Sequence, residues 1–233
     1  MEFSFNEILT LSLLIGLELV LGIDNVLLIS IVTGRLPENE RGKARTVALA
    51  MAFLLRVGFV FGAAALVRMT TPVLGQFSLK DLILIAGGGF LLFKAVKEIH
   101  HTVEHHADSG AQVQAKAASF ASAVTQLVLL DIVFSIDSVI TAVGLTDHLW
   151  VIISAVLVSF LIVLAFANAV SNFVEKNPAM KILALSFLVT IGVTLFIEGL
   201  GHDVPKGYIY LPMGFALAVE LLQMRFDSNR RKK

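Results

Sequence analysis

The chain has 233 residues, of which 57% are hydrophobic and only 15% are charged. Ordinary soluble domains hold roughly 45–50% apolar residues, so this composition excludes a soluble globular domain and predicts a protein that crosses a membrane several times. Basic and acidic residues are equal in number, at 18 each, which gives no net attraction to nucleic acid. The absence of cysteine excludes disulfides and thiolate metal ligands.

Seven apolar runs predict an all-α polytopic membrane protein with seven transmembrane helices, because about 20 helical residues cross a bilayer. We expect these helices near residues 8–33, 46–67, 81–99, 122–145, 149–171, 181–199 and 208–224. The N-terminal segment is acidic where a secretory signal peptide is basic, so we expect the first helix to stay uncleaved.

The distribution of basic residues predicts the orientation. If the N-terminus is outside, most lysines and arginines between the spans are cytoplasmic, and the opposite side holds only Arg68, Lys80 and Lys206. Cytoplasmic segments of membrane proteins are enriched in these residues. We therefore expect a multi-pass protein of the plasma (bacterial inner) membrane, with the N-terminus outside and the C-terminus in the cytoplasm.

The first and fourth predicted helices carry the same acidic pattern. Glu18 and Asp24 in the first, and Asp131 and Asp137 in the fourth, are each separated by five residues. A carboxylate in hydrocarbon costs at least about 2.5–3.5 kcal/mol, so the repetition favours duplication over coincidence. An odd number of spans from one copy to the next gives the copies opposite orientations, as in the inverted repeats of transporters.

The predicted organisation has four parts, with a three-helix repeat on each side of a polar linker and a seventh helix without a counterpart. We expect a first repeat over 1–99, a cytoplasmic histidine-containing linker over 100–121, a second inverted repeat over 122–201, and the seventh helix with a basic tail over 202–233. Gly58, Gly62 and the run Gly87–Gly89 allow close backbone approach between helices, which favours packing inside the bundle over a dimer interface.

Acids outnumber bases inside the predicted spans. The acids are Glu18, Asp24, Asp131, Asp137, Glu198 and Glu220, and the bases are Arg56 and Lys94. Neighbouring carboxylates in a poorly solvated place raise one another's pKa, so protons or bound cations must balance the surplus. Acids that alternate between protons and a metal form the core of a proton/cation exchanger. The structural alternative, in which the acids only pair with the two bases and each other, is disfavoured by the surplus.

Helical spacing predicts which ligands share a face. Positions seven apart point in nearly the same direction from the axis of a straight helix. Glu18 should therefore share a helix face with Asn25, and Asp131 should share one with Ser138. Oxygen ligands suit Mn(II), Mg(II) or Ca(II). The predicted metal ligands are Glu18, Asp24, Asn25, Asp131, Asp137 and Ser138, and the candidates for proton coupling or for contacts to these ligands are Lys94, Arg56, Glu198 and Glu220.

The second acid of each pair requires a further condition. Asp24 and Asp137 join the same site only if their helices are interrupted, and we expect the interruptions near Gly22 and Ser135. Lys94 is a candidate internal cation that fills the site when no metal is bound. Its alternative role is to extend toward the cytoplasmic end of the third span.

A histidine cluster follows the third predicted span on its cytoplasmic side. His101 and His105 are four residues apart and share a face of a continuing helix, as do His100 and Glu104, and His106 follows. Neutral imidazoles bind transition metals. Metal binding by this cluster and a solvated linker without ligand are both open interpretations.

Four segments resemble the TerC family of membrane proteins, which is named for tellurium resistance and associated with manganese export. Glu18–Asn25 and Asp131–Ser138 are similar to its two signature segments, Gly88–His100 to its third-span segment, and Tyr208–Glu220 to its last. The resemblance spans nearly the whole chain. It implies a seven-span fold with Mn(II) as cargo, bound by the acids of spans one and four.

The predicted function is export of Mn(II) from the cytoplasm by proton antiport through a carboxylate site at the middle of the membrane. Export against an inside-negative potential costs roughly 4–5 kcal/mol per 100 mV for a divalent ion, and the chain has no phosphate-binding loop for ATP. Replacing Asp24 or Asp137 with asparagine is expected to abolish transport. We expect no enzyme activity and no cofactor, because no nucleophile–base arrangement or cofactor motif stands out.

Two alternatives remain open at this stage. One is a Ca(II) or Mg(II) exchanger, because oxygen ligands discriminate poorly among these ions. The other is a non-transporting membrane partner that delivers metal to secreted proteins or scaffolds a metal-stress complex. The expected partners are the lipid bilayer, a divalent cation and protons, and the sequence leaves the oligomeric state open.

Overall fold

The computed structural model describes residues 5–104 and 119–230, apart from the side chains of Phe5, Ile23 and Asp24. The long helices in these ranges are α1 (Phe5–Thr33), α2 (Glu38–Phe61), α4 (Leu79–Glu104), α5 (Phe120–Leu145), α6 (Leu149–Lys176), α7 (Pro178–Gly199) and α8 (Gly207–Arg230). Between α2 and α4 lie the short helix α3 (Ala63–Arg68) and a hairpin of β1 (Pro72–Leu74) and β2 (Phe77–Ser78). The predicted all-α class is confirmed.

The long helices differ in whether their length and apolar content are sufficient to cross a membrane. Among the described residues, six helices are long and apolar enough, namely all the long ones except α4. Helix α4 carries Lys94, Lys97 and Glu98 in its second half and three consecutive glycines before them, which lowers its apolar content. The predicted number of seven spans therefore stays a prediction.

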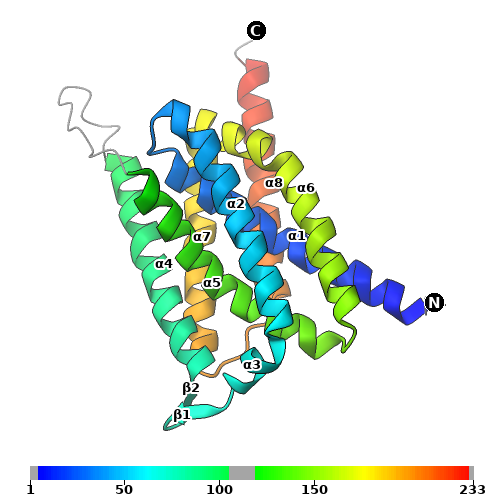
Figure 1. Ribbon diagram of the computed structural model, residues 1–233. Coiled ribbons are helices and arrows are strands. Elements are labelled where there is room, and N and C mark those ends of the chain that lie inside the picture. Colours follow the sequence, from blue (N-terminus) through cyan, green and yellow to red (C-terminus); the bar gives the residue numbers. More distant parts are fainter. Residues whose placement is uncertain (1–4, 105–118, 231–233) are drawn as a thin grey trace.

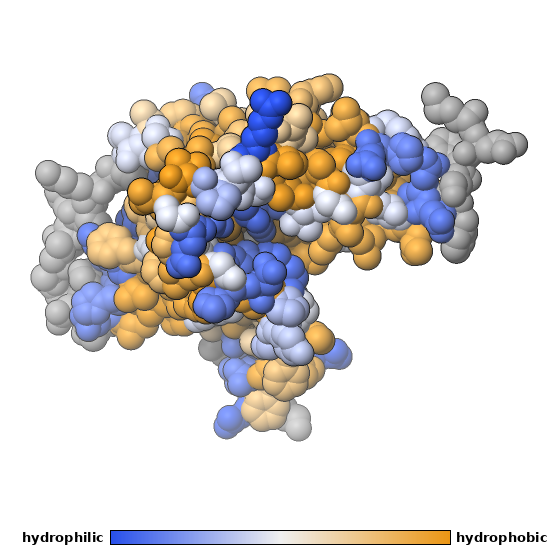
Figure 2. All heavy atoms as spheres, turned by 90° about the horizontal axis from the view of Figure 1, so that it is seen from below, coloured by the Kyte–Doolittle hydropathy of each residue, from blue (hydrophilic) through white to orange (hydrophobic). Residues whose placement is uncertain are grey.

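The helices connect at two opposite ends of the bundle (Figure 1). One end holds the β1–β2 hairpin and the segments that join α5 to α6 and α7 to α8. We call this end the hairpin face. The opposite end, with the turn between α1 and α2, the C-terminal end of α4 and the N-terminal end of α5, is the linker face. Seen from the hairpin face, hydrophilic residues gather near the middle and apolar residues predominate around them (Figure 2). This distribution is typical of a bundle whose sides contact lipid.

Helix α2 begins and ends earlier than the predicted span 46–67. It ends at Phe61, and the Gly62 amide donates to the Gly58 carbonyl at 2.9 Å before the chain turns into α3. The predicted helix packing at Gly58 and Gly62 is wrong. A Cβ at Gly58 would meet no atom within 4 Å, and one at Gly62 would meet only the preceding turn of its own helix.

Helices α4 and α7 pack most closely, and glycines permit it. A Cβ on Gly88 would lie 2.7 Å from the Phe196 nitrogen and 2.8 Å from the Gly192 carbonyl oxygen. The prediction of close packing at Gly87–Gly89 is confirmed for Gly87 and Gly88, since Gly87 faces Val133 of α5 in the same way. Backbones approach this closely only where side chains are missing.

The other main helix contacts are α1 with α6 and α2 with α5. Suppose that α1 is exchanged with α5, α2 with α6, and α4 with α7. The contact α1–α6 then becomes α5–α2, and the contact α4–α7 stays the same, so the three main helix contacts are unchanged. Two related three-helix units would pack in this way, which supports the duplication interpretation. The inverted repeat itself stays a prediction.

Candidate cation site

Glu18 and Asn25 lie on one face of α1, as their spacing predicts, and line the same cavity. This central cavity has a volume of about 40 Å³ and is enclosed by α1, α2, α5 and α6. A buried water needs about 10–15 Å³ measured in this way. The cavity therefore has room for a few water molecules or a partly hydrated cation.

Asp131 of α5 faces Asn25 across the central cavity. The Asn25 amide nitrogen donates to Asp131 Oδ1 at 3.2 Å, and the Ser135 hydroxyl donates to Asp131 Oδ2 at 3.2 Å. Asp131 is only 5% exposed. Both carboxylate oxygens thus have a neutral donor, but no described cation forms an ion pair with this carboxylate.

The base nearest to these acids is Arg56 of α2. Its Nη1 donates to Glu18 Oε2 in a buried ion pair, while Nη2 is buried without a hydrogen-bond partner among the described residues. Because Arg56 and Asp131 line the same cavity, this space holds one guanidinium and two carboxylates. With all three groups ionised, the cavity carries one surplus negative charge.

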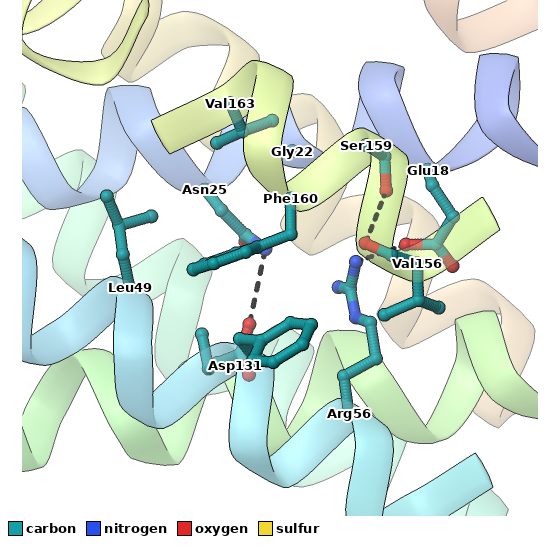
Figure 3. Close-up of a pocket in the computed structure, with 12 residues that line it drawn as sticks. Glu18, Gly22, Asn25, Leu49, Arg56, Asp131, Val156, Ser159, Phe160 and Val163 are labelled. Atoms are coloured by element: carbon teal, nitrogen blue, oxygen red, sulfur yellow. Dashed lines mark hydrogen bonds and ion pairs between the residues drawn. The ribbon is translucent and has the colours of Figure 1, made fainter. Parts of the chain in front are cut away.

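Aromatic rings close another side of the cavity. Phe53 of α2 and Phe160 of α6 stack with ring centroids 4.3 Å apart, and Val163 packs beside them. Figure 3 shows Arg56 directed toward Glu18, Asn25 directed toward Asp131, and Phe160 between the helices. The apolar wall lowers the local dielectric and strengthens the electrostatic interactions of the carboxylates.

Asp137 lies outside the central cavity, closer to the hairpin face. Lys80 Nζ is 3.3 Å from its Oδ1, and Lys206 Nζ is 3.1 Å from its Oδ2. Lys206 also contacts Glu198 Oε1 at 2.8 Å. These two acids and two lysines form a balanced set, which we call the hairpin-side cluster.

A second cavity of about 40 Å³ lies beside this cluster and is lined by Asp137, Ser138 and Lys206. Glu18 lines this hairpin-side cavity as well as the central one. The predicted ligands therefore divide into two groups, Glu18, Asn25 and Asp131 in one cavity and Asp137 and Ser138 in the other, with Glu18 common to both.

The expected helix interruptions are absent, because α1 and α5 run continuously through Gly22 and Ser135. The missing side chain of Gly22 instead leaves room for Val163 of α6 to pack against α1. The Ser135 hydroxyl donates a hydrogen bond to Asp131. The predicted ligand Asp24 lies in α1, but its side chain is outside the described part of the structure.

The count of bases inside the spans missed Lys80 and Lys206. Both come from segments outside the predicted spans, yet they reach Asp137 and, through Lys206, Glu198. One feature of the sequence could have indicated these partners, because Lys80 and Lys206 are two of the three basic residues predicted for the non-cytoplasmic side of the membrane. Among the described side chains, the negative surplus is accordingly smaller than the sequence suggested, and the central cavity holds part of it.

Other candidate residues lie elsewhere. Lys94 lines a cavity near the linker face and neither of the two cavities lined by the predicted ligands, and its role as a cation filling the metal site stays a prediction. Glu220 is half-buried on α8 and lines neither of the two acidic cavities.

The histidine cluster is described only in part. His100 Nε2 lies 3.1 Å from Glu104 Oε2 on the exposed end of α4, which agrees with the predicted shared face. His101 is also in α4, and His105 and His106 lie outside the described residues. Within residues 5–104 and 119–230, no three acidic, histidine or cysteine side chains group closely enough to hold a metal.

The sequence model of the family described as "Integral membrane protein TerC family" matches residues 3–233. The chain belongs to the TerC family. The fold of this TerC-family chain is therefore that of an integral membrane protein. No solved structure matches it.

Bacterial inner membrane proteins are among its relatives. It is 44% identical over 223 residues to the UPF0053 inner membrane protein YgdQ of Escherichia coli K12. This match covers 94% of the chain and 93% of YgdQ. It is 41% identical over 221 residues to a UPF0053 protein of Haemophilus influenzae, covering 93% of each. YegH of Escherichia coli is 43% identical, but the chain spans only 42% of that protein.

Proposed function

We propose that this TerC-family chain is a transporter that exports Mn(II) from the cytoplasm in exchange for protons. The observation that carries the proposal is the central cavity, where Glu18 pairs with Arg56 while Asp131 has no ion pair with a described cation. A site with one unmatched negative charge favours a cation or a proton over neutral occupants.

The ligand chemistry supports a hard divalent ion. Two carboxylates and the side-chain oxygen of Asn25 are oxygen ligands, which Mn(II), Mg(II) and Ca(II) accept. Asn25 donates its amide nitrogen to Asp131, so its oxygen is free to face a cation after a small rotation of the side chain.

Exchange with protons follows from competition at the same carboxylates. A metal ion binds Glu18 when its carboxylate is ionised and competes with Arg56 for that charge, whereas protonation of Glu18 removes the charge and weakens the ion pair. The two ligands therefore exclude each other at one group, which couples their movement. Glu18 gives this exchange access to the hairpin-side cavity, because it lines both spaces.

The test is a flux measurement on the purified full chain in proteoliposomes. An acidic interior should drive uptake of external Mn(II) several-fold faster than equal pH on both sides, and a pH dye should report proton loss from the interior. Asp131→Asn should abolish both signals. Asp203→Asn, a change of an exposed acid near the hairpin face, is the matched control and should retain them.

Other outcomes distinguish the alternatives. Faster movement of Ca(II) or Mg(II) than Mn(II) under the same gradient would replace the cargo but keep the exchanger. Binding of Mn(II) without movement of any metal would reject transport and leave a membrane partner that holds metal.

A further inference from the structure

A third cavity, near the linker face, carries a surplus of positive charge, whereas the central cavity carries a surplus of negative charge. It has a volume of about 160 Å³ and lies among α1, α4, α5 and α7. Arg35, Lys94 and Glu98 contribute charged groups to its lining, and Ser122 and Gln126 contribute neutral polar ones. Neither the cation site nor its proposed mechanism uses this linker-side cavity.

Cations outnumber anions at the linker-side cavity. Arg35 forms an ion pair with Glu98, and Lys181 Nζ lies 3.4 Å from the other carboxylate oxygen, Oε1. Glu98 is only 6% exposed and uses both oxygens in these contacts. Lys94, one turn before Glu98 on α4, has no ion pair among the described residues and brings a third positive charge.

The α5 wall of the cavity adds donors and a favourable dipole. Ser122 and Ala123 lie in the first turn of α5, whose N-cap Ser119 accepts a hydrogen bond from the Ser122 amide at 3.2 Å. The N-terminal end of a helix carries partial positive charge. The Ser122 hydroxyl and the Gln126 amide supply neutral donors beside the cations.

We propose that the linker-side cavity binds a phosphate group, either of inorganic phosphate or of an anionic phospholipid. An uncompensated ammonium in a confined site is costly, and a phosphate offers several acceptor oxygens to Arg35, Lys94 and the α5 donors. Basic pockets between helices at a membrane surface are typical sites for anionic headgroups. Apolar walls of Leu28, Leu91 and Leu188 suit the glycerol and acyl portion of a lipid.

The experiment uses the full chain purified in detergent. Equilibrium dialysis with labelled inorganic phosphate measures the free anion, and native mass spectrometry with phosphatidylglycerol against phosphatidylcholine measures the lipid. Lys94→Gln should weaken binding of the preferred probe at least ten-fold. Lys97→Gln removes an exposed charge from the same helix outside the cavity and should leave binding unchanged.

Two further variants protect the test against misfolding. Lys94→Arg should retain binding, because it keeps the charge. Gln126→Leu should weaken binding without changing any charge, because it removes a neutral donor from the cavity wall. The proposal is overturned if the wild type binds neither probe more tightly than Lys94→Gln, or if Lys97→Gln loses as much affinity.

Discussion

Arg56 is the residue on which the central cavity depends. Its side chain is 10% exposed and its partner Glu18 is 5% exposed, so both charges are removed from water. The net contribution of such a pair is small, but removing one partner leaves the other charge buried and unpaired. Nη2 has no hydrogen-bond partner among the described residues, so these protein groups use only part of the guanidinium.

We expect Arg56→Gln to lower the free energy of unfolding by about 3 kcal/mol, because Glu18 then remains charged without a partner. The double variant Glu18→Gln/Arg56→Gln should recover much of this loss, since neither buried charge remains. Thermal unfolding in detergent measures both. Arg68→Gln, at an exposed position, should have almost no effect, and an Arg56→Gln protein as stable as wild type would contradict this account.

Helices α4 and α7 form the tightest contact between elements. Gly88 faces Gly192 at their crossing, and Gly199 approaches Asp81 and Ile85 of α4 farther along. Contacts with backbone atoms cannot be relieved by rotation of a side chain. The separation of the two helices is therefore fixed by the missing side chains.

We expect Gly88→Ala to destabilise the protein by about 1–3 kcal/mol, because the new methyl group would lie 2.7 Å from a backbone nitrogen of α7. Gly89→Ala is the matched control, since its Cβ would meet only the Phe196 ring at 3.9 Å. That control should be neutral or gain up to about 1 kcal/mol from helix propensity. Thermal unfolding of the two variants side by side decides, and equal stability of both would refute the close contact.

The helices were predictable from hydrophobic runs, whereas their contacts were not. Spacing on α1 placed Glu18 and Asn25 on one face correctly, because this depends only on helical periodicity. The partners of Asp137 depend on how segments far apart in sequence meet at the hairpin face. Lys80 and Lys206 were therefore invisible as partners. The separate cavity that Lys94 lines was not predictable for the same reason.

Across the whole molecule, the three cavities differ in charge. The central cavity has a negative surplus, the hairpin-side cluster is balanced, and the linker-side cavity has a positive surplus. In the hairpin-side cluster, Lys206 lies outside the helices, and its pKa is shifted. Burial lowers the pKa of Lys206, but Asp137 and Glu198 outweigh burial and hold that pKa above its ordinary value.

We expect the contribution of Lys206 to stability to depend on pH. Its folded pKa exceeds the unfolded value of about 10.4, so the contribution is complete below that pH and is lost as pH rises through the folded pKa. The stability difference between wild type and Lys206→Gln should therefore be constant from about pH 7 to 9.5 and shrink at higher pH. Thermal unfolding over this range measures it, with Lys176→Gln, an exposed change, as the control. A difference that grows with alkaline pH would reverse the sign and refute the account.

The seam between α4 and α7 limits how the molecule can change shape. The two helices run in opposite directions (Figure 1), and Lys181 contacts Glu98 at the linker face. A piston-like slide of α4 along α7 would push the Gly192 backbone into Leu92 and pull that ion pair apart. We therefore expect α4 and α7 to travel as one block, so that any opening of the central cavity occurs along the boundary where α1, α2, α5 and α6 meet.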